Sequence, residues 1–123
     1  HPLFKDKDKK FNSPAFNFDE VVKLPSNGVC LASNKINKIQ SLYFNVGDTR
    51  IWGLQYHPEI TYEKMISLIE FRKDRLIENR KAFRNDKEIR KHISFIREEI
   101  AVSNKAQRML ELKNWLDNIK HYN

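Results

Sequence analysis

All four prolines and all three glycines of this 123-residue chain lie before residue 61. Proline and glycine interrupt helices and favour turns, so the first part of the chain is expected to form strands and loops. The residues after 61 carry apolar side chains at helical spacing and are expected to form helices. The chain is long enough for one modest domain but not for two ordinary ones. A mixed α/β chain with its strands first and its helices last is therefore predicted.

Four segments of the first part have strand character: residues 15–24, 29–32, 39–46 and 50–56. The last two face each other across Gly47-Asp48-Thr49, which predicts a β-hairpin. The second arm is apolar at nearly every residue, a pattern typical of a strand that is covered on both faces, inside a sheet rather than at its edge. The first part is therefore predicted to contain a hairpin whose second arm needs cover on both sides.

The second part divides into three predicted helices. Thr61 can cap a helix that begins at Tyr62, with a pattern that continues to Phe83, Asn85 opens the next helix and Ser103 caps the last. Their apolar rows are Met65, Leu68, Ile69 and Leu76 in the first, Ile89, Ile93, Ile96 and Ile100 in the second, and Met109, Leu112, Leu116 and Ile119 in the third. Each row covers one face only, so each helix is expected to bury that row against another element.

The chain itself does not supply enough surface to cover the apolar strand and the apolar rows of the three helices. A few short strands cannot make a sheet broad enough to cover both faces of residues 51–56 as well as three amphipathic helices, because small domains bury little surface. The chain is therefore expected to be part of a larger fold.

Tyr56-His57-Pro58-Glu59 follows the apolar strand directly and precedes the first helix. In extended backbone, residues i and i+2 project to the same side, so His57 and Glu59 are expected to stand next to each other. A carboxylate beside an imidazole fixes its tautomer and stabilises the imidazolium, which suits a general base with its orienting group. The simpler interpretation is that His57 ends a strand and Glu59 begins a helix, where a carboxylate favours the helix dipole.

Four stretches match a known family in their order and their intervals: Asp19-Glu20-Val21-Val22-x-Leu24-Pro25, Leu31-Ala32-Ser33-Asn34, Ile39-Gln40, and Trp52-Gly53-Leu54-Gln55-Tyr56-His57-Pro58-Glu59-Ile60. With them the chain resembles the C-terminal half of class I glutamine amidotransferases, most closely the stand-alone group similar to the glutaminase domain of GMP synthase. The opening His1-Pro2-Leu3-Phe4 and the tail 103–116 also fit that group. The resemblance is most specific at residues 52–60.

The resemblance implies a flavodoxin-like α/β sandwich that hydrolyses the side-chain amide of glutamine. In that family a cysteine on a strand-to-helix elbow attacks the amide, ammonia leaves, and water releases glutamate from the thioester. His57 matches the family's base and Glu59 its orienting carboxylate. By the same resemblance, residues 1–75 are the incomplete C-terminal part of the amidotransferase domain, and residues 76–123 are a helical C-terminal extension.

The chain departs from the family pattern at two positions. Cys30, the only cysteine, lies in an apolar strand without a Gly-x-Cys-x-Gly elbow, and buried cysteines of this kind are usually inert. The nucleophile is therefore expected in a missing N-terminal half, on the same or a separate chain. Alone, this chain is expected to be inactive toward glutamine or another γ-glutamyl substrate. Asn17 stands where the family usually has histidine.

Two other classes of function stay open. The surface left by a missing half would suit a non-catalytic interaction module that binds a partner chain. The net charge of +7 would suit nucleic acid. However, the charges are scattered over both halves without a stacking or groove-reading motif, so nucleic acid is not the favoured partner.

The sequence also bears on the cell compartment and on cofactors. No run approaches the ~18 consecutive apolar residues of a membrane span, and no signal-peptide pattern opens the chain. A soluble, cytoplasmic protein is expected. A single cysteine excludes an internal disulfide framework and a cysteine-based zinc site. No cofactor is expected.

Overall fold

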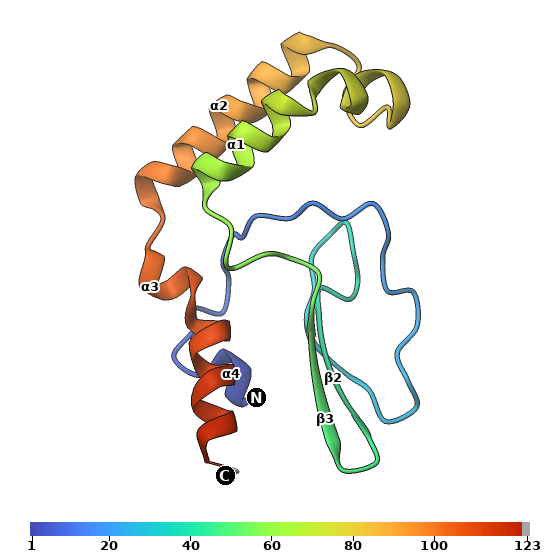
Figure 1. The fold of residues 1–123 in the computed structure, drawn as a ribbon, viewed down its shortest axis with the longest axis vertical. Helices are drawn as coiled ribbons and strands as arrows, with labels where there is room; N and C mark the ends of the chain where they lie inside the picture. Colours follow the sequence, from blue (N-terminus) through green and yellow to red (C-terminus); the bar gives the residue numbers. More distant parts are fainter. Residues whose placement is uncertain (122–123) are drawn as a thin grey trace.

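The computed structural model describes residues 1–121 and shows a mixed α/β chain, a three-stranded antiparallel sheet followed by helices (Figure 1). In chain order the elements are η1 (Pro2–Phe4), β1 (Val29–Ala32), β2 (Ser41–Val46), β3 (Thr49–Leu54), α1 (Tyr62–Phe71), η2 (Arg75–Asn79, a π-helical turn), α2 (Asp86–Val102), α3 (Lys105–Arg108) and α4 (Leu110–Lys120). The predicted change from strands to helices is confirmed. None of the helices within residues 1–121 is long and apolar enough to cross a membrane.

The sheet has the order β1-β2-β3, and both strand pairs are antiparallel. β2 and β3 form the predicted hairpin, in which Val46 pairs with Thr49 and the two residues between them make the turn. Gly47 has a φ of 56° there, a left-handed conformation that glycine adopts without steric cost. The strand predicted at 29–32 is also confirmed, as β1. The turn residues thus set the register of the hairpin.

Two predictions about the strands are wrong. Residues 15–24 form no strand, because this segment runs beside the helical core: Phe16 packs on that core, while Phe18 and Val22 are exposed. β3 lies at an edge of the sheet, since β2 is its one partner strand within residues 1–121, and residues 51–54 are only half-buried. An apolar pattern shows that a strand needs cover, but not what supplies it.

The caps predicted for the first two long helices are confirmed. The side chains of Thr61 and Asn85 each accept a hydrogen bond of 3.1 Å from a backbone N–H in the first turn of α1 and α2. α1 ends at Phe71 rather than continuing to Phe83, and it is followed by η2 and by Lys81, whose φ is 52°. The chain reverses direction here, so that α2 packs back along α1 (Figure 1).

The main hydrophobic core lies between α1 and α2. Its buried residues are Tyr62, Ile66, Ile69, Ile89, Ile93 and Ile96, and the side chains packed against them are Phe16, Met65, Leu76, Ile77, Phe83 and Ile100. The isoleucine row predicted in the second helix is therefore confirmed, whereas in the first helix Ile69 is the member of the predicted row that is buried. Full burial of a side chain of this size contributes ~1.5–3 kcal/mol, so the six buried side chains of this helix pair are a main source of stability.

The last helical region differs most from its prediction. Ser103 ends α2, and Asn104 rather than Ser103 caps the short α3. The buried residues of α4 are Glu111 and Asn114, while Trp115, Leu116 and Ile119 of the same helix are exposed. The reason is that α4 packs on η1 and the turn after it, where backbone carbonyls favour polar partners. Asn114 Nδ2 donates to the carbonyl oxygens of Leu3 at 3.0 Å and Lys5 at 2.9 Å.

His92 of α2 should make the stability of the chain depend on pH. Its ring lies near Phe83 and Phe95, with centroids 5.4 and 6.3 Å away, and burial lowers its pKa below the ordinary value of 6.5. The folded chain therefore binds this proton less readily than the unfolded chain. This contribution to stability is present above the pKa that His92 has in the unfolded chain. It is lost as the pH falls from there toward the lower pKa that His92 has in the folded chain.

The measurement is the urea midpoint at pH steps between about 7.5 and 5.5, for the wild type and for His92→Gln. We expect the midpoint of the wild type to fall over this range, and that of the variant to fall less. Equal slopes for the two proteins would contradict the prediction.

Candidate functional site

His57 and Glu59 lie in the segment between β3 and α1. His57 Nδ1 is 2.8 Å from Glu59 Oε1, so the side chains are adjacent as predicted. The reason expected for this is wrong, because residues 57–60 form a turn rather than extended backbone: the Ile60 N–H donates to the His57 carbonyl oxygen at 3.1 Å. Pro58 between them is fully buried and anchors the link. Both side chains reach solvent, with 41% of His57 and 52% of Glu59 exposed. The pair is formed and accessible, while its roles as base and orienting carboxylate stay predictions.

Residues from the N-terminal part of the chain support the loop that carries His57. The backbone N–H of His57 donates to the Pro14 carbonyl oxygen at 2.8 Å. The Phe16 ring lies beside the imidazole, with a centroid distance of 6.4 Å. One backbone bond to Pro14 and one ring contact with Phe16, which lies in the segment 15–24 that was predicted to be a strand, therefore hold this loop.

The charge on Glu59 is set by its neighbours. Partial burial alone would raise its pKa, but hydrogen bonds from His57 and from its own backbone, with electrostatic interactions from His57 and Arg108, hold that pKa below the ordinary value of 4.5. The carboxylate is therefore ionised at neutral pH. An ionised carboxylate at Nδ1 favours the proton on that nitrogen and leaves Nε2 free to accept another.

A buried group of polar side chains adjoins this pair in the chain through Tyr56, the residue before His57, and was not predicted from the sequence. In this group, which we name the Glu111 cluster (Lys7, Tyr56 and Glu111), the Tyr56 hydroxyl donates to Glu111 Oε1 at 2.8 Å and Lys7 Nζ lies 2.9 Å from Glu111 Oε2. The side chains of Lys7 and Glu111 are 3% and 0% exposed. Burial, reinforced by the Glu111 carboxylate, raises the pKa of Tyr56, so its hydroxyl stays protonated and donates.

Arg108 of α3 contacts the same loop from the side of α1. Its Nη1 donates to the carbonyl oxygen of Pro58 and, at 3.1 Å, to that of Ile60. These two carbonyls flank Glu59 in the chain. Neither Arg108 nor Glu111 was predicted to contact this loop, because the last helix was expected to turn its apolar row toward the interior.

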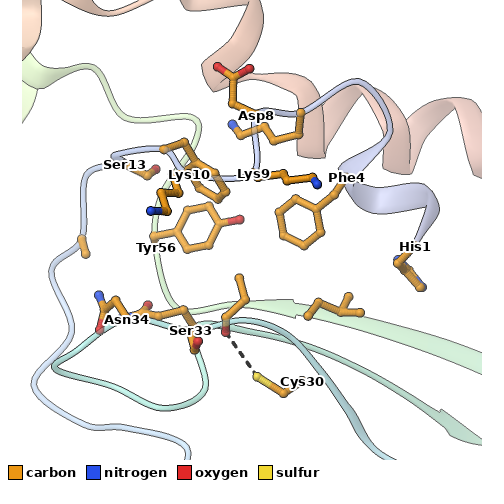
Figure 2. A pocket seen from close by; sticks show the side chains of 16 residues that line it. His1, Phe4, Asp8, Lys9, Lys10, Ser13, Cys30, Ser33, Asn34 and Tyr56 are labelled. Carbon is orange, nitrogen blue, oxygen red and sulfur yellow. Dashed lines mark hydrogen bonds between the residues drawn. The ribbon is translucent and has the colours of Figure 1, made fainter.

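Cys30 is not brought to the His57–Glu59 pair. It lines a cavity of about 820 Å³ between the N-terminal segment and β1, where its Sγ donates to the Ala32 carbonyl oxygen at 3.3 Å (Figure 2). The described residues that line this cavity include Tyr56 but neither His57 nor Glu59. Cys30 is exposed, so the expectation of a buried thiol is wrong: β1 is an outer strand, and its first two residues, Val29 and Cys30, are both exposed.

The remaining candidate residue, Asn17, lies in the segment that supports the loop. Its Nδ2 donates to the Asp19 carbonyl oxygen at 3.1 Å, and its side chain lines a small hollow together with Phe16 and His92. In the described range 1–121, no group of three or more His, Cys, Asp or Glu side chains is arranged to hold a metal ion.

One comparison with known proteins found a relative. No protein-family model matches the chain, and no solved structure matches it. Over 61 residues the chain is 38% identical to the γ-glutamyl-L-1-hydroxyisopropylamide hydrolase of a Pseudomonas species. The match covers 50% of this chain but only 20% of that hydrolase. The chain thus has a distant, partial similarity to a γ-glutamyl amide hydrolase.

Proposed function

We propose that this chain is the C-terminal part of a class I glutamine amidotransferase-like hydrolase that cleaves a γ-glutamyl amide. The observation that carries the proposal is the 2.8 Å contact between His57 Nδ1 and Glu59 Oε1 directly after a strand. The partial similarity to a γ-glutamyl amide hydrolase supports the same substrate class. In this proposal residues 1–75 complete a flavodoxin-like sandwich, and residues 76–123 extend it.

In this proposal each nitrogen of His57 has its own task. Nδ1–H donates to Glu59, so Nε2 is the nitrogen that takes the proton from a cysteine thiol. The thiolate sulfur then bonds to the γ-carbonyl carbon of the substrate. The bond from that carbon to the amide nitrogen breaks, and the proton on Nε2 leaves with the amine. Water attacks the resulting thioester, which releases glutamate and returns the thiol.

The nucleophile of this mechanism is proposed to lie outside the chain. Cys30 is exposed on β1 in a cavity that His57 and Glu59 do not line. A glycine-flanked elbow is also absent around Cys30 in the sequence. The partner proposed for this chain is therefore an N-terminal half with the cysteine elbow, on the same polypeptide or on a separate one.

The test compares two forms of the protein in an assay of amine release from glutamine and from γ-glutamyl alkylamides. The first form is the polypeptide isolated from its own cells, with its mass and N-terminal sequence determined, and the second is the 123-residue chain alone. We expect release by the first, provided that it carries an upstream cysteine elbow, and none by the second. The proposal fails if the elbow is present and no γ-glutamyl amide is cleaved. It also fails if the chain alone turns over substrate and loses this activity on His57→Ala.

A further inference from the structure

Two direct links join the C-terminal helices to the loop that carries the His57–Glu59 pair. One is the Glu111 cluster, in which Tyr56 of the loop donates to Glu111 of α4 at 2.8 Å. The other is Arg108 of α3, whose guanidinium donates to the carbonyls before and after Glu59. The backbone is therefore held from α3 and α4 immediately before His57 and on both sides of Glu59.

We infer that Tyr56, Arg108 and Glu111 are positioning residues for the His57–Glu59 pair. Two side chains that are about half exposed lose conformational freedom when they hold one geometry. A rigid backbone beneath them lowers that cost, because fewer torsions remain to be ordered. This role rests on the proposed function, since the position of the pair matters for chemistry only if the pair is catalytic.

Glu111 can supply this rigidity because its buried carboxylate cannot replace a lost hydrogen bond with one from water. It is fully buried, and both of its oxygens are used, one by Tyr56 and the other by Lys7. Lys7 Nζ also donates to the Gln107 carbonyl oxygen at 2.6 Å and lies 4.3 Å from the centroid of the Phe11 ring. Any shift of Tyr56 away from Glu111 would leave a buried acceptor without its donor, which is costly.

The face that α4 buries supports a positioning role over a purely structural one. A helix that only covers a core turns its apolar side chains inward. α4 instead buries Glu111 and Asn114 and leaves Leu116 and Ile119 exposed. The residues directed inward are thus those that form hydrogen bonds with the loop at Tyr56 and with the N-terminal segment.

The experiment reads the tautomer of His57 in the 123-residue chain at a pH where the ring is neutral, from the nitrogen chemical shifts of the imidazole. His121, which is exposed, gives a reference for a ring near α4 in the same spectrum. The variants are Tyr56→Phe, Arg108→Met and the two combined. We expect His57 of the wild type to show more of the Nδ1–H tautomer than His121 does. Each single variant should lose part of that excess, and the double variant most of it.

Two matched variants separate positioning from general damage. Tyr62→Phe removes the hydroxyl of another buried tyrosine, and Arg90→Met removes an exposed arginine that pairs with Asp86. Neither should change the tautomer of His57. A double variant with wild-type helix content and an undiminished Nδ1–H excess would overturn the inference. If the double variant does not fold, Arg108→Met alone decides, and an unchanged excess in that variant overturns the inference equally.

The tautomer does not depend on turnover, so the inference and the proposed function can fail separately. Loss of the Nδ1–H excess in the variants supports positioning even if the complete protein cleaves no γ-glutamyl amide. In the complete protein, the same variants should lower kcat with little change in KM, because they touch the loop and not the substrate.

Discussion

Glu111→Gln is expected to lower the free energy of unfolding of this chain by about 3–5 kcal/mol. The amide can still accept the hydrogen bond from Tyr56, but it removes the negative charge that faces the Lys7 ammonium at 2.9 Å. Lys7 is then a buried cation without a counter-charge, since its side chain is only 3% exposed. Domains of this size have a total stability of roughly 5–15 kcal/mol. The loss should therefore appear as a large shift of the urea midpoint, followed by circular dichroism.

Two further variants identify the buried charge as the cause. Lys7→Met combined with Glu111→Gln removes both charges and should recover most of the loss, because a neutral pair of similar volume needs no desolvation of ions. Asp117→Asn breaks the exposed ion pair of Lys113 and Asp117, which is 2.6 Å long, and should have a much smaller effect. If Glu111→Gln costs no more than Asp117→Asn, the cluster does not stabilise the fold as described.

His57→Ala in the complete protein should lower kcat for a γ-glutamyl amide by about 10²- to 10⁴-fold, the usual contribution of a general base. The reason is that Nε2 is the nitrogen left free by the 2.8 Å contact between Nδ1 and Glu59. Glu59→Gln should also lower kcat, because an amide no longer holds the imidazole in one tautomer or stabilises the imidazolium. The measurement is steady-state amine release across substrate concentrations, which separates kcat from KM.

His92→Gln serves as the control for His57→Ala. It replaces a histidine on α2 that contacts Phe83 and Phe95 rather than the loop at 57–59, so kcat should be unchanged. Wild-type kcat in His57→Ala would show that this histidine is not the base, and the proposed function would have to be given up.

Features decided within a few residues could be predicted from the sequence. Thr61 and Asn85 cap their helices with their own side chains, and Gly47 makes the hairpin turn through its own backbone. The contact between His57 and Glu59 is also local, because a turn in which the Ile60 N–H donates to the His57 carbonyl oxygen at 3.1 Å brings the two side chains together, and the C-terminal helices hold that turn in place.

Features that depend on a distant partner could not be predicted. The row of Leu112, Leu116 and Ile119 is as regular as the isoleucine row of α2, yet α4 buries the face of Glu111 and Asn114. Its partner in space is the start of the chain, whose carbonyls and Lys7 select polar side chains. Periodicity identifies the two faces of a helix, but the chemistry of the opposing surface decides which one is buried. For the same reason residues 51–56 were predicted to lie inside a sheet, whereas β3 lies at an edge of the sheet formed by the described residues.

The Lys7–Glu111 contact also bears on when the loop at 57–59 is set during synthesis. It joins residues 104 positions apart, so its closure cost is among the largest that a chain of this length can have, and long-range contacts of this kind form late in folding. A ribosome delivers the N-terminal part first. Lys7, Tyr56, His57 and Glu59 thus leave the ribosome well before Glu111 does. A nascent chain would carry both members of the pair without the helix that holds them, and the geometry of the pair would be completed only once α4 has left the ribosome.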